Sequence, residues 1–471
     1  MRTQCSESQA EFQELGGRKV QAVFDGGHIS SDGGALLLRE LDLKLGITRR
    51  LAQCFTDWRD ARFVEHSVLE LVRQRVYGIA LGYEDLNDHD DLAKDPLLAL
   101  AVGKRDPEGQ DRVRTQDQGR PLASDSTLNR LELTPETLSP KNRYWKIVHH
   151  AQQFEELFVT LFLESHTTPP EEIVLDFDAT DDPLHGGQEG RFFHGYYDCY
   201  CYLPLYVFCG DRLLMAKLRT SDRDGADGTK EALVFLVKRI RERWPHVRII
   251  LRGDSGFTRD EVMAWCEDNG VHYLLGLAKN ARLLKKIGNE LVRARDCFRQ
   301  TGHASRLFTG FVWTTKKSWT RPRRVIAKAE HLAKGPNPRF IVTSLPADYA
   351  PPKALYEEHY CARGEMENRI KEQQLDLFAD RTSTRAFRAN QLRLWFSSIA
   401  YVLVSSLRRI ALQDTRMAKA TCASIRLKLL KIGAQTKVSV RRLLVHLSSA
   451  CPYKDVFMQA WRNLQTLPMR C

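Results

Sequence analysis

The chain lacks the features that would place it in a membrane or outside the cell. No run of about 18 apolar residues occurs, so no transmembrane helix and no membrane partner are expected. Residues 1–18 are polar and lack the apolar segment of a secretory signal, which predicts a cytoplasmic location. The 11 cysteines include no Cys-x-x-Cys pair, which disfavours a zinc site or a disulfide framework. Internal repeats and low-complexity tracts are also missing.

The composition is that of an ordinary globular protein, but its charges are segregated. The 471 residues are 43% hydrophobic and 28% charged, enough for two to four domains with a sizeable core. Residues 282–339 hold 15 Lys or Arg against 3 acidic residues, and residues 380–471 hold 17 against 3. Because the net charge is only +12, the remainder is acidic. This predicts two basic surfaces that face a polyanion such as nucleic acid, the alternative being a basic surface that only aids solubility.

The hydrophobic pattern changes at Pro169-Pro170. Residues 29–165 carry apolar side chains mostly at helical spacing. After the prolines the pattern predicts strands over 173–178, 196–208, 213–218, 247–251 and 273–277, and helices over 229–244 and 260–269. That order predicts an α/β fold with a mixed sheet, in which three antiparallel strands lead into parallel additions.

Two further segments complete the predicted organisation. Residues 284–345 contain three predicted strands and one of the two basic segments, which indicates a β-rich basic insertion. A long helix is expected over 356–377, another over 385–412, and a basic helical region from 419 onward. The predicted parts are a helical N-terminal region (1–168), a core (169–283 and 346–412), the insertion (284–345) and a helical C-terminal region (413–471).

Two aspartates follow predicted central strands. Asp178 ends the first strand in the sequence LDFDAT, and Asp254 follows a later strand in ILRGDSGF. Open α/β sheets place ligands at the carboxyl ends of their strands, where such side chains converge. Hard divalent cations prefer carboxylate oxygens, and two such cations can clamp both oxygens of a phosphoryl transfer. Asp176 shares a strand face with Asp178 and is the alternative first ligand.

A third carboxylate comes from the predicted helix over 356–377. Its polar residues step by three or four positions and therefore form one stripe: Tyr360, Arg363, Glu367, Lys371 and Gln374. A stripe of this composition is not a core face and can meet a metal and a phosphate backbone. The alternative is an exposed helix with a Glu367–Lys371 ion pair.

These residues resemble a known family. The chain is similar to the DDE transposases of bacterial insertion sequences, in the group marked by the signature Tyr-x2-Arg-x3-Glu-x6-Lys. The matching positions are Asp178-Ala179-Thr180, Asp254, Tyr360, Arg363 and Glu367. Gln374 stands where the signature has Lys, and Lys371, one turn earlier, is the other candidate for that role. The phrases GYEDLNDHD, STLNRLE and RGEMENRIKE also resemble this family, so the likeness extends over nearly the whole chain.

The resemblance implies a fold, an activity and a set of roles. The core would be ribonuclease-H-like, interrupted by the insertion, and Asp178, Asp254 and Glu367 would bind two Mg²⁺, for which Mn²⁺ can substitute. The activity implied is cut-and-paste transposition, with cleavage at terminal inverted repeats and strand transfer into target DNA by a homodimer. Tyr360, Arg363 and Lys371 would hold the DNA backbone. The Asp-x-Thr pattern favours Asp178 over Asp176.

The insertion offers four further candidates for DNA binding. Trp313 and Trp319 flank Lys316 and Lys317, and aromatic rings among cations suit stacking on an unstacked base. In related transposases an aromatic side chain of the insertion holds a flipped base. The alternative is that both tryptophans pack a small β structure.

Two other functions compete with transposition. One is a ribonuclease-H-like nuclease that cuts DNA without joining it. The other is a non-catalytic DNA-binding relic of a transposase, which the intact Asp/Asp/Glu set disfavours.

Overall fold

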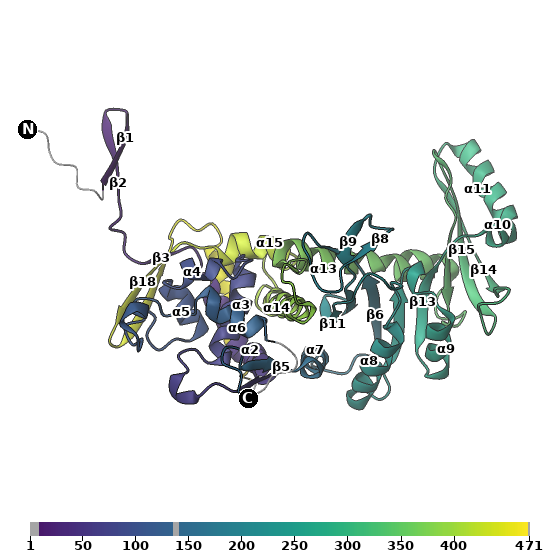
Figure 1. Ribbon diagram of the computed structural model, residues 1–471. Coiled ribbons are helices and arrows are strands. Elements are labelled where there is room, and N and C mark those ends of the chain that lie inside the picture. Colours follow the sequence, from purple (N-terminus) through teal and green to yellow (C-terminus); the bar gives the residue numbers. More distant parts are fainter. Residues whose placement is uncertain (1–8, 135–140, 470–471) are drawn as a thin grey trace, which may run out of the picture. The chain divides into compact units, whose positions relative to one another are not determined.

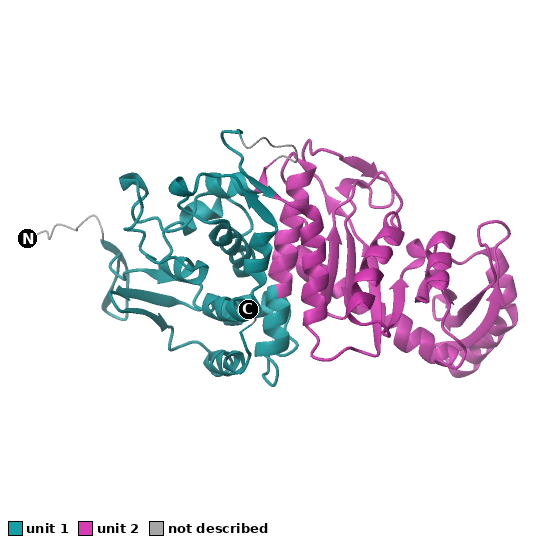
Figure 2. Cartoon of the chain, turned by 90° about the horizontal axis from the view of Figure 1, so that it is seen from below, with its two compact units in different colours: residues 1–131, 138–148, 403–471 teal, residues 132–137, 149–402 magenta. Residues whose placement is uncertain are grey.

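The computed structural model describes residues 9–134 and 141–469. Two compact units divide the chain (Figure 2): residues 1–131, 138–148 and 403–471 form unit 1, and residues 132–137 and 149–402 form unit 2. Segments from both ends of the sequence therefore fold together in unit 1. Within the described ranges, no helix has the length and apolarity needed to cross a bilayer.

Unit 1 is mainly helical with short β pairs. Its main elements are β1 (Gln9–Leu15), β2 (Arg18–Val23), β3 (Ile29–Ser30), α1 (Ala35–Leu45), α2 (Ile47–Gln53), β4 (Phe55–Asp57), α3 (Val68–Leu81), α4 (Asp88–Leu92), α5 (Pro96–Val102), α6 (Asp125–Glu132), β5 (Ile147–His149), α15 (Cys422–Ile425), β18 (Ala434–Ser439), β19 (Arg442–Leu447) and α16 (Lys454–Gln465).

The C-terminal part of unit 1 differs from the sequence-based prediction. A continuous basic helical region is expected from 419, yet β18 and β19 form a hairpin that adds β3 as a third strand. The β-branched residues Thr436, Val438 and Val445 favour extended backbone here, which the basic composition concealed. Among residues 419–469, the helical parts are α15, the π-helical turn that follows it, and α16.

Unit 2 carries the large sheet (Figure 1). Its elements are α7 (Ala151–Glu164), β6 (Glu172–Ala179), β7 (Asp182–Pro183), β8 (Phe192–His194), β9 (Cys199–Tyr202), β10 (Leu205–Cys209), β11 (Arg212–Lys217), α8 (Thr229–Arg243), β12 (Arg248–Gly253), α9 (Asp260–Asp268), β13 (His272–Leu277), α10 (Ala281–Lys286), α11 (Gly288–Thr301), β14 (Ser305–Trp313), β15 (Arg323–Leu332), β16 (Gly335–Pro336), β17 (Arg339–Thr343), α12 (Pro352–Ala354), α13 (Gly364–Lys371) and α14 (Phe387–Ser406), whose last residues enter unit 1.

The large sheet is mixed, as the sequence predicts. Its strand order is β11-β10-β6-β12-β13-β17-β15-β14, with β16 paired to β15. β11, β10 and β6 are antiparallel, whereas β12 and β13 run parallel to β6. The predicted segment 196–208 is split, since β9 joins a small sheet with β7 and β8 while β10 joins the large one.

The insertion is continuous with this sheet. It begins with α10 and α11, and its strands follow through β17, which pairs with β13 on one side and β15 on the other. All these insertion strands are antiparallel to their neighbours. One sheet therefore extends from the predicted core through the predicted insertion.

Alternation along the strands gives the sheet two different faces. In β6, Ile173, Leu175 and Phe177 point into a large core with residues of α7, α8 and α9. The opposite face holds a smaller core with Ile250 of β12, Leu274 of β13 and residues 355–356. Asp176 and Asp178 alternate with the buried apolar side chains and share this second face.

The segment that covers the second face is the predicted helix over 356–377. It is a run of helical turns: α12, a π-helical turn (Leu355–Tyr360), a 3₁₀ turn (Cys361–Arg363), α13 and a second π-helical turn (Glu372–Asp376). Leu355 and Tyr356 anchor its start in the smaller core. These changes of helical pitch differ from the single regular helix that the sequence predicts.

Candidate active site

The two strand-end aspartates lie at the carboxyl edge of neighbouring parallel strands. Asp178 is near the end of β6, and Asp254 directly follows β12, which pairs with β6 in register. The carboxylate of Asp254 also caps the next 3₁₀ turn, because its Oδ1 accepts a hydrogen bond of 2.7 Å from the backbone N–H of Gly256. The backbone turn therefore fixes the direction of this carboxylate.

Asp176, the alternative to Asp178, has another role. It faces Arg252 directly across β6 and β12, and the guanidinium donates two hydrogen bonds to it, at 2.5 Å from Nε and 2.8 Å from Nη2. Burial raises the pKa of Asp176, and the Arg252 hydrogen bonds oppose that shift. A carboxylate held in a buried bidentate pair has little capacity left for another cation, so we retain Asp178 as the candidate ligand.

Arg252 also connects the sheet to the segment that covers it. Its Nη1 donates to the backbone carbonyl of His359, the residue before Tyr360. One side chain thus ties β6, β12 and the π-helical turn together just below the strand ends. Sequence reasoning missed this residue, although Arg252 precedes Asp254 by two positions just as Asp176 precedes Asp178.

The helical segment brings Glu367 and Arg363 to the strand ends. The Arg363 guanidinium lies 3.6 Å from Asp178 Oδ2 and 2.7 Å from Glu367 Oε1. Burial raises the pKa of Asp178 to about 7; Arg363 opposes the shift, whereas Asp254 and Glu367 add to it. Asp178 therefore lies close enough to Asp254 and to Glu367 to feel the negative charge of each.

Tyr360 packs beside Asp254 through a close approach at Gly276 of β13. A Cβ at Gly276 would lie 2.6 Å from the Tyr360 hydroxyl and 2.8 Å from the backbone nitrogen of Ser255. Burial raises the pKa of Tyr360, so its hydroxyl is neutral and can donate a hydrogen bond. A glycine inside a strand is a sequence signal for such an approach, and the sequence analysis did not use it.

The donor set fits hard divalent cations. Asp178, Asp254 and Glu367 supply oxygen ligands, and their mutual repulsion would be relieved by positive charge among them. Within 9–134 and 141–469, no three His, Cys, Asp or Glu side chains are already arranged around one point that could hold a metal. The Arg363 guanidinium instead supplies the positive charge between Asp178 and Glu367.

Two residues are candidates for the role of the signature lysine. Gln374 Nε2 donates hydrogen bonds of 3.0 Å to the Asp181 carbonyl and 3.0 Å to Asp182 Oδ1, so it braces the segment after β6. Lys371 is exposed. The exposed ammonium of Lys371 is thus the better placed of the two for a phosphate, and that assignment stays a prediction.

Trp313, Trp319, Lys316 and Lys317 lie at the other edge of the sheet. β17 is antiparallel to β13, β15 is antiparallel to β17, and β14 is antiparallel to β15. Trp313 pairs with Arg323, so it lies at the end of the sheet where the parallel strands begin. Both tryptophans are partly buried against the large core. The lysines are exposed in the β14–β15 loop. The structure therefore places these four residues away from Asp178, Asp254 and Glu367. For the tryptophans, their partial burial favours the alternative that they pack the β structure.

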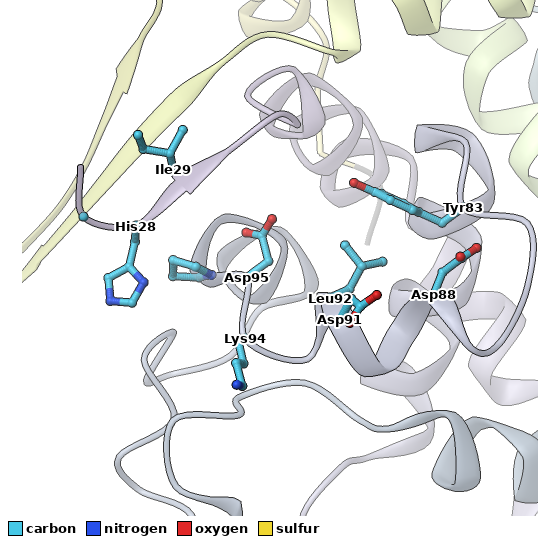
Figure 3. A pocket seen from close by; sticks show the side chains of 10 residues that line it. His28, Ile29, Tyr83, Asp88, Asp91, Leu92, Lys94 and Asp95 are labelled. Carbon is cyan, nitrogen blue, oxygen red and sulfur yellow. The ribbon is translucent and has the colours of Figure 1, made fainter. Parts of the chain in front are cut away.

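Two surface depressions differ in their suitability for phosphate. One lies beside Asp254 and Tyr360 and includes Lys279 and Arg339 in its lining. The other, in unit 1, is shown in Figure 3 and is lined by Asp88, Asp91 and Asp95, with Lys94 and Tyr83. Its carboxylates repel phosphate, so only the first depression suits a nucleic acid.

The geometry defines a class of protein before any comparison. Three carboxylates, an arginine and cationic side chains near the carboxyl edge of a mixed sheet are side chains of the kind that can act on a phosphate-containing substrate. The chain belongs to the family described as transposase DDE domain group 1, whose family model matches residues 12–469.

Comparison with individual proteins adds one structural likeness. None of the curated proteins compared with the chain matches it. Among solved structures, the chain is similar to a piggyBac transposase synaptic complex with hairpin DNA, with a TM-score of 0.42 and 11% sequence identity. That likeness covers 84% of this chain and 79% of the piggyBac chain.

Proposed function

We propose that this protein is a cut-and-paste DNA transposase of the Tyr-Arg-Glu-Lys signature group of bacterial insertion sequences. The proposal depends above all on one observation: Asp178 interacts electrostatically with both Asp254 and Glu367, and the three residues come from three separate segments of the chain. Membership of the DDE transposase family supports the reading of these residues as a catalytic set. The strand order β11-β10-β6-β12-β13 supports a ribonuclease-H-like core.

Each residue has a proposed role at the scissile phosphate. Asp178, Asp254 and Glu367 would hold two Mg²⁺, which when bound activate the attacking oxygen and stabilise the leaving oxygen. Arg363 would leave its carboxylate partners and hold a phosphate oxygen, because its fork of N–H donors fits either anion. Lys371 would hold a neighbouring phosphate as a point charge. Tyr360 would donate a hydrogen bond to the backbone near the break.

The partners of the proposed reaction are DNA molecules and a second copy of the chain. Terminal inverted repeats would be cut, target DNA would receive the freed ends, and two protomers would pair the ends. A test of the catalytic role uses a plasmid that carries the element's own ends, incubated with the purified protein and either Mg²⁺ or a chelator. We expect breaks at the ends with Mg²⁺ and none with the chelator. Metal-independent cleavage, or intact plasmid in both samples, would contradict the proposal.

The β14–β15 loop provides a prediction about salt dependence. Arg323 and Arg321 of this basic region are engaged with acidic side chains, whereas Lys316 and Lys317 are exposed. If both lysines contact duplex phosphates, Lys316→Ala with Lys317→Ala should reduce the slope of log K against log salt by about 1.8, or about 0.9 per contact. Fluorescence anisotropy over a salt series measures the slope.

A matched control separates this contact from general charge loss. Lys238→Ala removes an exposed lysine of α8, on the opposite face from the candidate site. The Lys238→Ala protein should show the same slope of log K against log salt as the unmodified protein. An unchanged slope in the Lys316/Lys317 double variant would show that the β14–β15 loop does not touch DNA.

A further inference from the structure

The β8–β9 hairpin carries exposed aromatic side chains that the proposed mechanism does not use. The exposed fractions are 54% for Phe193, 86% for Tyr196 and 44% for Tyr200. Phe193 and Tyr200 are directly paired across the two strands, with their ring centroids 5.6 Å apart. The Arg191 guanidinium lies over the Tyr200 ring at 4.1 Å. Contiguous exposed apolar side chains are a feature of binding surfaces, whereas single exposed ones are common.

The hairpin is anchored to the strand end that carries Asp178. β9 pairs with β7, which begins at Asp182, and the Tyr197 hydroxyl donates a hydrogen bond of 3.4 Å to the Ala179 carbonyl. Gln374 braces the same connection by its hydrogen bonds to Asp181 and Asp182. Figure 1 shows β8 and β9 projecting from unit 2 beyond β6. The aromatic surface therefore adjoins the candidate active site.

A cationic depression lies at the base of the hairpin. It is lined by Gly186, Gly187, Gln188, Ser383 and Arg385. Arg385 is exposed, and the two glycines leave the backbone accessible. The backbone carbonyl of Arg385 accepts a hydrogen bond of 2.8 Å from Glu189 N–H, which fixes this residue beside the hairpin. An exposed guanidinium next to accessible backbone and a hydroxyl is complementary to a phosphate group.

From this combination we infer that the β8–β9 hairpin is a platform for single-stranded DNA at the candidate active site. Unpaired bases would stack on Phe193, Tyr196 and Tyr200, and the backbone phosphate would lie against Arg385. Stacking is available only to bases that have left the double helix, whereas a cationic groove alone accepts a duplex. The inference depends on the proposed function, because strand cleavage at the neighbouring acidic residues creates the free strand that the platform would hold.

Equilibrium binding of two DNA probes tests the platform. The probes are a labelled oligodeoxythymidylate of about 20 nucleotides and a mixed-sequence duplex of the same length, both measured with a chelator so that no cleavage occurs. The double variant Phe193→Ser with Tyr196→Ser should weaken single-strand binding about 100-fold, since each of the two lost stacks costs roughly tenfold. Duplex binding should change less than about twofold. Both side chains are exposed, so the fold should be retained.

Three further variants make the result specific. Phe193→Tyr with Tyr196→Phe keeps both aromatic faces and should bind the single strand normally. Phe63→Ser removes an exposed phenylalanine in unit 1 that also has an arginine over its ring, and it should have no effect. Arg385→Gln should lower the single-strand salt slope by about 0.7.

Several outcomes would overturn the inference. One is unchanged single-strand affinity in the Phe193/Tyr196 serine variant, and another is an equal loss in Phe63→Ser. A change of oligomeric mass without loss of single-strand binding would assign the surface to self-association instead. Duplex binding by the unmodified protein separates the two failures. If the unmodified protein does not bind the duplex, the proposed function fails together with the inference. If it binds the duplex and one of the outcomes above occurs, only the inference fails.

Discussion

Replacement of Glu367 by Gln is expected to reduce DNA strand cleavage by roughly a thousandfold or more while DNA binding persists. The substitution preserves side-chain shape but removes one negative charge from the set that would hold two dications. Several kcal/mol of transition-state stabilisation are then lost, which corresponds to that rate factor. Asp178→Asn and Asp254→Asn should have the same effect. Affinity for DNA should stay equal or increase, because one repulsion against phosphate is removed.

Glu365→Gln is the matched control for this prediction. Glu365 lies on α13, two residues before Glu367, and its side chain is 73% exposed and lies 3.7 Å from Arg369. It should cut at the normal rate. Asp176→Asn is an unsuitable control because it disturbs the buried pair with Arg252. A Glu367→Gln protein that nicks element ends at a near-normal rate would disprove the assignment of Glu367.

Loss of Arg252 is expected to produce the largest change in stability. Arg252→Met leaves the carboxylate of Asp176 without its partner, and that side chain is only 3% exposed. Breaking one side of a buried ion pair typically costs about 3–5 kcal/mol. The π-helical turn also loses its bond at the His359 carbonyl, so residual folded protein should cleave DNA more slowly. The midpoint of urea unfolding measures the loss.

Two variants test whether the broken buried pair is the cause of the lost stability. Arg252→Met combined with Asp176→Leu removes both charges and should recover most of the lost stability, since buried pairs are often replaceable by apolar side chains. Arg248→Met breaks an exposed pair with Glu172 on the same two strands, at 3.3 Å, and should cost less than about 1 kcal/mol. Equal unfolding midpoints for Arg252→Met and Arg248→Met would contradict the account of the buried pair.

The sequence was sufficient to predict the mixed sheet because its strands have local signatures. The short apolar runs over 173–178, 247–251 and 273–277 predict β6, β12 and β13, which the structure confirms. The strand directions also follow, since a hairpin gives antiparallel strands and a helix between two strands favours a parallel pair.

Contacts that depend on register could not be predicted. Arg252 meets Asp176 only because β12 and β6 pair in one register, and no local pattern specifies that. The position of Trp313 depends on three successive antiparallel pairings. The positive charge around Trp313 and Trp319 favoured the insertion as the DNA-stacking element, and that role stays a prediction, although both tryptophans are partly buried. Composition shows that aromatic residues and cations share a segment but not which edge of the sheet they occupy.

The assignment of Asp178, Asp254 and Glu367 depends on both the sequence and the structure. Strand-end positions and the Tyr-Arg-Glu spacing selected Asp178, Asp254 and Glu367, and the structure adds their proximity and the ion pair between Arg363 and Glu367. The distinction between Lys371 and Gln374 required coordinates, because both positions lie on one helical stripe. Their catalytic roles stay predictions until the cleavage chemistry is measured.

The most direct test of the central claim maps DNA ends at nucleotide resolution. The purified protein is incubated with DNA that carries the element's own ends, a target plasmid and Mg²⁺, and the products are sequenced. We predict breaks at the outer edge of the terminal repeats and free 3′-hydroxyl ends that become joined to target DNA. Ends that are cut but never joined would indicate a nuclease without transposase activity, and bound but uncut ends would indicate a non-catalytic DNA-binding protein; either result would contradict the account.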